Sequence, residues 1–193
     1  MSRPADIMIA LLGAGRASRF GADKLSQSCA GKPLGQWALE AAQAMELPLV
    51  WIAGDAAPDF VTCEVVRNSR ASEGMSTSVI CAARAARRRG ARRVLFMLAD
   101  MPLVTSDLLR RLIEAGEAAG CRYPEGYAGV PALIPVRALE NRVRLERDQG
   151  AGAILRSIDG LALLDCSDSE LFDVDTPQAL AHAECLLRER TAA

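Results

Sequence analysis

Short runs of apolar residues alternate along the chain with segments in which apolar positions recur every three or four residues. The runs have the length of buried strands and lie at residues 7–12, 49–53, 63–66, 93–99, 130–135 and 161–164. Strands that alternate with helices in this order are typical of βαβ units, in which the connected strands are parallel. The pattern therefore predicts an α/β protein built on a mostly parallel sheet.

The first two helices are marked by residues that favour helix ends. The first is expected after Pro33, a residue suited to the first helical position. Its apolar face is formed by Leu34, Trp37, Ala38, Ala41 and Met45. The second is expected from about residues 76–78 to Gly90. A run of arginines near its end complements the helix dipole and indicates a solvated helix end: Arg84, Arg87, Arg88 and Arg89.

The later helices begin at threonines, which cap helix N-termini well. Thr105 is expected to precede the third helix, and Thr176, followed by Pro177, is expected to precede the last. Residues 120–129 are predicted to form a loop. Neither repeats nor a linker interrupt the 193 residues, so we expect residues 1–193 to form a single domain.

Composition excludes several classes of function. Half of the residues are apolar, and the net charge of −1 gives no bias toward nucleic acid or an anionic membrane. Aromatic residues make up only 4%, too few for a platform that stacks single-stranded bases. No apolar run approaches the roughly 20 residues of a membrane span. The run at residues 7–12 is too short for a signal peptide, and a glycine-rich loop follows it, so we expect a cytoplasmic protein.

The histidine and cysteine content narrows the chemistry further. His182 is the single histidine and falls in an alanine-rich helical stretch, so a Ser-His-Asp triad or a multi-histidine metal site is not expected. The six cysteines lie far apart without a CxxC pair, and we interpret them as reduced, buried thiols. Catalysis must then depend on carboxylates, lysine, arginine, backbone amides and a hard metal ion.

The segment from Leu12 to Leu25, LGAGRASRFGADKL, directly follows the first strand. Open α/β sheets bind ligands at the carboxyl ends of their strands. Glycines in such a loop let the backbone approach a ligand, and successive N–H groups form a nest for phosphate. The loop carries these glycines and basic residues: Gly13, Gly15, Gly21, Arg16, Arg19 and Lys24. Together they predict a triphosphate site.

Two common phosphate-binding motifs do not fit this loop. A Walker A motif requires GxxxxGK[ST], but Gly21 is followed by Ala22, Asp23 and Lys24. A dinucleotide fingerprint requires GxGxxG, and Ser18 stands where the third glycine belongs. The acidic residue expected about 20 positions later is also missing, since Asp55 comes too late.

The loop instead resembles the LAAGxSxRMGxxKL signature of the MobA-like nucleotidyltransferases, and within them it is most similar to molybdenum cofactor cytidylyltransferases. The matching residues are Leu12, Ala14, Gly15, Arg19, Gly21, Lys24 and Leu25, whereas Gly13, Ala17 and Phe20 replace motif residues. The resemblance implies a Rossmann-like, three-layer α/β/α sandwich of the nucleotide-diphospho-sugar transferase type. It also implies that Leu12, Gly13, Ala14 and Gly15 bind nucleotide, and that Arg19 and Lys24 both bind it and act in catalysis.

Two separated carboxylates complete this interpretation. The strand at 93–99 ends in Asp100-Met101-Pro102, and a carboxylate at the carboxyl end of a strand faces the ligand crevice. This segment resembles the family's ADMP element, whose aspartate binds the metal. Asp173 and Asp175 resemble the family's DxDTP element. Spacing alone does not choose between them, because alternate residues of an extended segment share a side, but the resemblance favours Asp175. It thus implies Mg²⁺ on Asp100 and Asp175, with Asp100 also catalytic.

The remaining motifs divide the chain into a nucleotide side and an acceptor side. Five residues resemble the family's N…GMSxS segment near the base and sugar: Asn68, Gly74, Met75, Ser76 and Ser78. About residues 1–105 are expected to bind nucleotide, and the remainder to form most of the acceptor side. There the chain has Gly129-Val130-Pro131 where the family commonly has Gly-His-Pro, and Gly152 where it has the arginine of GDxGAR.

The resemblance implies transfer of CMP from CTP to molybdopterin, with release of pyrophosphate and with a molybdoenzyme or its chaperone as a partner. The guanylyltransferase branch, which uses GTP, is an alternative, although its loop usually reads LAGG. A sugar-phosphate or isoprenoid-pathway cytidylyltransferase is another. Outside this class stand a non-catalytic nucleotide- or cofactor-binding accessory protein and a nicotinamide-dependent oxidoreductase, the latter disfavoured by the incomplete fingerprint.

Overall fold

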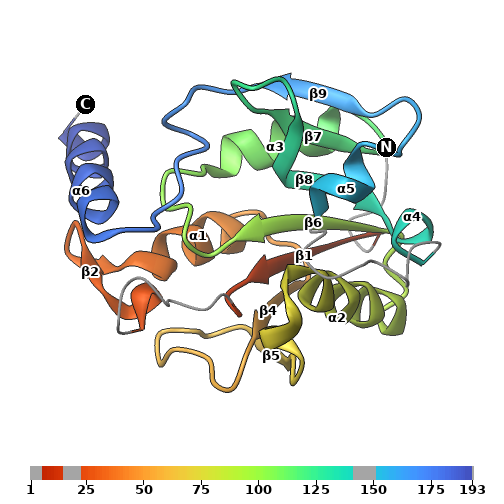
Figure 1. Cartoon of the computed structure of the whole chain (residues 1–193), viewed down its shortest axis with the longest axis horizontal. Coiled ribbons are helices and arrows are strands. Elements are labelled where there is room, and N and C mark those ends of the chain that lie inside the picture. Colours follow the sequence, from red (N-terminus) through yellow and green to blue (C-terminus); the bar gives the residue numbers. More distant parts are fainter. Residues whose placement is uncertain (1–5, 15–22, 141–150, 193) are drawn as a thin grey trace.

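The computed structural model describes residues 6–14, 23–140 and 151–192. Its centre is a seven-stranded sheet (Figure 1) formed by β1 (Ile7–Leu12), β4 (Leu49–Ala53), β5 (Glu64–Arg67), β6 (Arg93–Leu98), β7 (Ala119–Arg122), β8 (Ala128–Pro135) and β9 (Ala162–Asp165). The strand order is β5-β4-β1-β6-β8-β7-β9. β8 runs antiparallel to both of its neighbours, and the other six strands share one direction.

Helices cover both faces of the sheet (Figure 1): α1 (Leu34–Gln43), α2 (Met75–Arg88), α3 (Ser106–Glu114), α4 (Val136–Glu140) and α5 (Ala151–Leu155). A further helix, α6 (Pro177–Ala192), lies at one end of the molecule. Alternation along β1 separates the layers, because Ile9 and Leu11 pack with α1 and α3. Met8 and Ala10 pack with α2, α4 and α5 on the opposite face. The result is the three-layer sandwich that the sequence predicted. None of the described helices combines the length and apolarity needed to cross a membrane.

α6 lies outside these layers and closes one end of the molecule. Ala183 and Leu187 pack against Leu34 of α1 and Cys29 in a small apolar cluster. Cys29 belongs to the short hairpin formed by β2 (Ser28–Cys29) and β3 (Lys32–Pro33). The cluster also contains Val174. α6 therefore holds the segment that carries Asp173 and Asp175 against the body of the sheet.

Most predicted elements are confirmed, several within one or two residues. β1 and β4 have the predicted bounds, and Thr105 accepts a hydrogen bond from the Leu108 amide at the start of α3. Pro33, however, precedes the helix in an extended conformation and does not take its first helical position. α4, α5, β2 and β3 were not predicted.

The loop predicted at residues 120–129 is wrong, because these residues include most of β7 and the start of β8. Gly120 and Gly129 lie within these strands and permit close contacts inside the sheet, whereas Gly126 lies in the turn between them. A Cβ at Gly129 would lie 2.4 Å from the ring of Tyr123, and one at Gly120 would lie 3.4 Å from the Gly129 carbonyl oxygen. Such contacts depend on residues from the neighbouring strand.

The single histidine lies on the surface, and none of the six cysteines forms a disulfide. His182 is exposed on α6 and makes an edge contact with Phe172, in line with a structural or surface role. All six cysteines are free thiols. Burial is complete for Cys29 and Cys121, and it raises the pKa of Cys29 to about 11. The prediction of burial is wrong for Cys185, which is exposed on α6.

Candidate active site

Three charged side chains from distant parts of the chain meet at the carboxyl edge of the sheet. Lys24 begins the short 3-10 helix η2 (Lys24–Ser26), Asp100 follows β6, and Asp175 lies two residues before the start of α6. The Lys24 ammonium donates to Asp100 Oδ2 at 2.8 Å and to Asp175 Oδ1 at 3.1 Å. One cation therefore bridges two carboxylates that are 75 residues apart in sequence.

The backbone fixes these side chains in place. The Val174 amide donates to the Asp100 carbonyl at 3.0 Å, and the Val174 side chain is fully buried. The two flanking aspartates, Asp173 and Asp175, therefore lie on the opposite side of the extended segment from Val174. At the other end of the site, Asp23 accepts from the Leu25 amide at 3.2 Å and caps η2, which positions Lys24.

The electrostatics of the site favour a charged lysine. Partial burial by itself would lower the pKa of Lys24, but the charge and hydrogen bond of Asp100, and then those of Asp175, outweigh burial and raise it. At Asp173 the surroundings disfavour the charged form. Desolvation, followed by the negative charges of Asp175 and Asp100, raises the pKa of Asp173 above its ordinary value. Among the described residues, negative charge thus exceeds positive charge near Asp173.

A divalent cation fits the pair Asp100 and Asp175. Both carboxylates already converge on one cationic group, the ammonium of Lys24. Asp100 Oδ1 is buried and has no hydrogen-bond partner within the described structure, so one ligand atom is available. Among the described residues no group of three or more His, Cys, Asp or Glu side chains is arranged to hold a metal. A hard cation on two carboxylates would then take its other ligands from phosphates and water, as Mg²⁺ commonly does.

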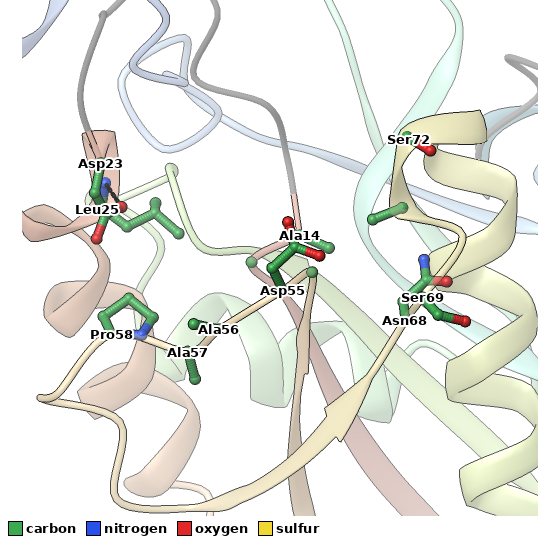
Figure 2. A pocket seen from close by; sticks show the side chains of 13 residues that line it. Ala14, Asp23, Leu25, Asp55, Ala56, Ala57, Pro58, Asn68, Ser69 and Ser72 are labelled. Carbon is green, nitrogen blue, oxygen red and sulfur yellow. Dashed lines mark hydrogen bonds between the residues drawn. The ribbon is translucent and has the colours of Figure 1, made fainter.

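A cavity of about 560 Å³ lies at the same edge, beyond the ends of β1, β4 and β5. Figure 2 shows Ala14 and Asp55 at its centre, Asp23, Leu25 and Pro58 on one side, and Asn68, Ser69 and Ser72 on the other. The remaining lining residues are Gly13, Gly54, Ala56, Ala57 and Ala71. Asp23, next to Lys24, connects the cavity to the charged cluster.

Trp51 of β4 lies against the backbone of Gly13, directly after β1. This side chain is fully buried, and its ring packs edge-on against Phe60. A Cβ at Gly13 would lie 2.4 Å from the indole, so glycine is required where the backbone passes over the ring. The Gly13 amide donates to the Ile52 carbonyl at 2.9 Å. The indole N–H has no hydrogen-bond partner among the described residues.

Asn68 lines the cavity, but its side chain bonds inward. Its amide donates to Thr77 Oγ1 at 2.8 Å and to Ser78 Oγ at 3.0 Å, and its Oδ1 accepts from the Arg70 amide at 3.0 Å. These bonds tie the loop after β5 to the first turn of α2. Gly74, at φ +116°, makes the turn into α2 in a conformation that favours glycine.

The structure places the predicted site residues in different positions. Lys24, Asp100 and Asp175 come together, and Gly13, Ala14 and Asn68 line the cavity. Gly74, Met75 and Ser76 begin α2 without lining it, and Leu12 is buried at the end of β1. Gly15 and Arg19 lie outside the described residues.

Several lining residues were missed by the sequence analysis. Asp55 and Pro58 follow β4, and Ser69 and Ser72 follow β5. Their position directly after two predicted strands was an available signal, because parallel strands bring such loops to the same edge.

The structure is an α/β fold with a charged cluster beside a cavity at the carboxyl edge of its sheet, and comparison with known proteins gives its family. Residues 9–162 match the model of the MobA-like NTP transferase domain. The chain therefore belongs to the MobA-like NTP transferase family. Asp173 and Asp175 lie beyond the matched residues.

Named relatives are similar over most of this chain. The bifunctional protein GlmU of Geobacter metallireducens is 31% identical over 163 residues, which are 80% of this chain and 31% of GlmU. The chain therefore spans less than a third of that relative. The purine catabolism protein PucB of Bacillus subtilis is 29% identical over 187 residues, covering 86% of this chain and 90% of PucB.

Solved structures of other proteins have a fold similar to that of this chain. Rv0371c from Mycobacterium tuberculosis superposes with a TM-score of 0.73 and is 25% identical, covering 92% of this chain and 96% of the other. A second structure of Rv0371c is a complex with manganese; it has a TM-score of 0.70, is 24% identical and covers the same shares of the two chains.

Proposed function

We propose that this protein transfers CMP from CTP to molybdopterin in a Mg²⁺-dependent reaction. The observation that carries the proposal is the position of Lys24 between Asp100 and Asp175, beside a cavity at the carboxyl edge of the sheet. A basic group and two converging carboxylates at the end of parallel strands are suited to a polyphosphate and its divalent ion.

In this reaction a terminal phosphate oxygen of the acceptor attacks the α-phosphorus of CTP. The bond from that phosphorus to the bridging oxygen of the β-phosphate breaks, and pyrophosphate leaves with the bonding electrons. No side chain has to form a covalent bond, so the contribution of the protein is positioning and neutralisation of charge.

Each part of the site has a role in this scheme. The cavity at Ala14, Asp55 and Asn68 receives the base and ribose, and Asp100 and Asp175 would hold Mg²⁺. When bound, the ion would neutralise and orient phosphate oxygens. Lys24, kept protonated by its raised pKa, neutralises the departing pyrophosphate. Gly15 and Arg19 are expected to add phosphate contacts.

The identities of donor and acceptor rest on the motif resemblance. Ala14 stands where the guanylyltransferase loop has a glycine, which favours CTP over GTP. The pterin acceptor, delivery to a molybdoenzyme or its chaperone, and a cytoplasmic location belong to the same proposal. Six free thiols are compatible with a reducing compartment.

The proposal is tested by incubating the protein and Mg²⁺ with molybdopterin and one of CTP, GTP or UTP. Pyrophosphate and the dinucleotide product are measured together. We expect equal amounts of pyrophosphate and cytosine dinucleotide with CTP, and little product with GTP or UTP. Product from GTP alone would move the protein to the guanylyltransferase branch. Absence of pyrophosphate with every triphosphate, despite binding of CTP, would indicate an accessory protein and overturn the proposal.

A further inference from the structure

The two tyrosines of the chain meet at the tip of the hairpin between β7 and β8. The Tyr123 amide donates to the Tyr127 carbonyl at 3.0 Å, and the Gly126 amide donates to the Tyr123 carbonyl at 2.8 Å. Gly126 completes the turn at φ +84°. Residues paired across a hairpin project from the same face, and the two rings stack with centroids 4.9 Å apart and planes 14° apart.

Tyr123 is held rigidly by the strand beneath it. Its hydroxyl donates to the Val130 carbonyl at 2.7 Å. Its ring lies directly over Gly129, where a Cβ would come within 2.4 Å of a ring carbon. Val130 occupies the position at which the family commonly has histidine. The aromatic pair is therefore fixed to the segment in which this chain departs from the family pattern.

The hairpin tip lies at the same edge of the sheet as the charged cluster. β7 and β6 point in the same direction, so Tyr123, after the end of β7, and Asp100, after the end of β6, project from the same edge. Burial is the main reason that the pKa of each tyrosine is raised; Cys121 for Tyr123 and Glu125 for Tyr127 come next, and the negative charge of Asp173 adds to both shifts.

Tyr127 presents an aromatic surface that the protein leaves open. Tyr123 covers one side of its ring, yet the residue remains 45% exposed, among the largest exposures of a bulky apolar residue in the described chain. A planar, conjugated heterocycle can stack on such a ring, whereas a sugar or polyol phosphate has no flat face to offer.

We propose that Tyr127, backed by Tyr123, is the platform on which a planar heterocyclic acceptor stacks. This inference rests on the proposed nucleotidyl transfer, and the platform lies at the same edge of the sheet as Asp100. The stacked pair would compensate for the histidine that Val130 replaces, since both features lie on the same hairpin. A flat acceptor would thus be selected by ring stacking, and its phosphate would point toward Asp100 and Asp175.

The probe for this inference is 6-hydroxymethylpterin, a fluorescent planar bicycle, titrated into the full chain with Mg²⁺. Tyr127→Ala should weaken binding of the probe about 5- to 100-fold, the range expected for loss of one stacking contact. The matched control Tyr127→Phe keeps the ring and should bind within about twofold of the native protein. Gly129→Ala, which displaces the Tyr123 ring without touching the probe, should also weaken binding.

CTP binding is measured in parallel by thermal shift, so that the two proposals fail separately. Unchanged pterin binding in Tyr127→Ala would overturn the platform, and so would loss of binding in Tyr127→Phe, which would assign it to the hydroxyl. Native protein that binds glucose 1-phosphate but not the pterin would also overturn it. Failure of the native protein to bind CTP, with pterin binding still dependent on Tyr127, would reject nucleotidyl transfer and support the platform.

Discussion

Gly13 passes so close to Trp51 that a β-carbon would lie 2.4 Å from the indole ring. The family signature has alanine at this position, so the glycine and the buried tryptophan form a matched pair. Trp51 is fully buried, with an indole N–H that lacks a partner among the described residues. The pair therefore fixes the distance between the Gly13 backbone and β4 at a point where Gly13 lines the cavity.

The matched pair predicts that restoring the family's alanine is harmful only while the tryptophan is present. Gly13→Ala should lower the free energy of unfolding by about 1–3 kcal/mol through overpacking. Trp51→Leu alone should lower it by roughly 2–4 kcal/mol through the cavity it leaves. In the double variant the two losses should not add, because the smaller side chain makes room for the methyl group. Urea denaturation measures all four proteins, and strictly additive losses would contradict the pairing.

Removing the Lys24 ammonium is expected to strengthen metal binding in the absence of nucleotide. Its ammonium competes with a divalent ion for Asp100 and Asp175 in the protein without nucleotide. Lys24→Met should therefore bind Mn²⁺ more tightly than the native protein in the absence of nucleotide, by up to about fivefold, or ~1 kcal/mol. Binding of CTP should weaken in the same variant, because a phosphate contact is lost.

Electron paramagnetic resonance of free Mn²⁺ measures the metal affinity directly. Lys32→Met is the matched control, since Lys32 pairs with Glu40 on α1 and does not contact the two aspartates. Equal or weaker Mn²⁺ binding in Lys24→Met would show that the ammonium does not compete for the metal position.

Replacing the Asp173 carboxylate is expected to increase stability in a pH-dependent way. Desolvation and the charges of Asp175 and Asp100 raise its pKa in the folded state above the ordinary 3.8. The folded protein then binds the proton more tightly than the unfolded chain, so the carboxylate costs stability once the pH exceeds the folded pKa. Asp173→Asn should raise the melting temperature at pH 7, and this gain should disappear as the pH falls through the raised pKa toward 3. A gain of equal size at both pH values would exclude the electrostatic cause.

Local signals in the sequence were sufficient for the fold and for part of the site. β1 and β4 were predicted with their bounds because continuous apolar runs are typical of strands buried on both faces. Asp100 and Lys24 could be placed together because Asp100 comes directly after the predicted strand at 93–99 and Lys24 lies in the segment that follows the predicted strand at 7–12. Carboxyl ends of parallel strands share one edge, so proximity followed from topology.

Other features depend on contacts between distant segments and had no local signal. The glycines of residues 120–129 resembled loop residues, but Gly129 lies beneath Tyr123 from the adjacent strand. Asn68 was predicted to bind nucleotide and lines the cavity, but the bonds of its side chain to Thr77 and Ser78 in the first turn of α2 had no local signal. Packing partners of this kind cannot be read from spacing along one segment.

The central claim is that Asp100 serves nucleotidyl transfer as a metal ligand, and its isosteric variant tests this most directly. Asp100→Asn keeps the shape of the side chain but removes the charge, and Asp107→Asn on the exposed face of α3 is the matched control. The measurement is the rate of pyrophosphate release from CTP and molybdopterin at saturating Mg²⁺. We expect kcat to fall by at least about 100-fold in Asp100→Asn and to stay within about twofold of native in the control. Native turnover in Asp100→Asn would contradict the account.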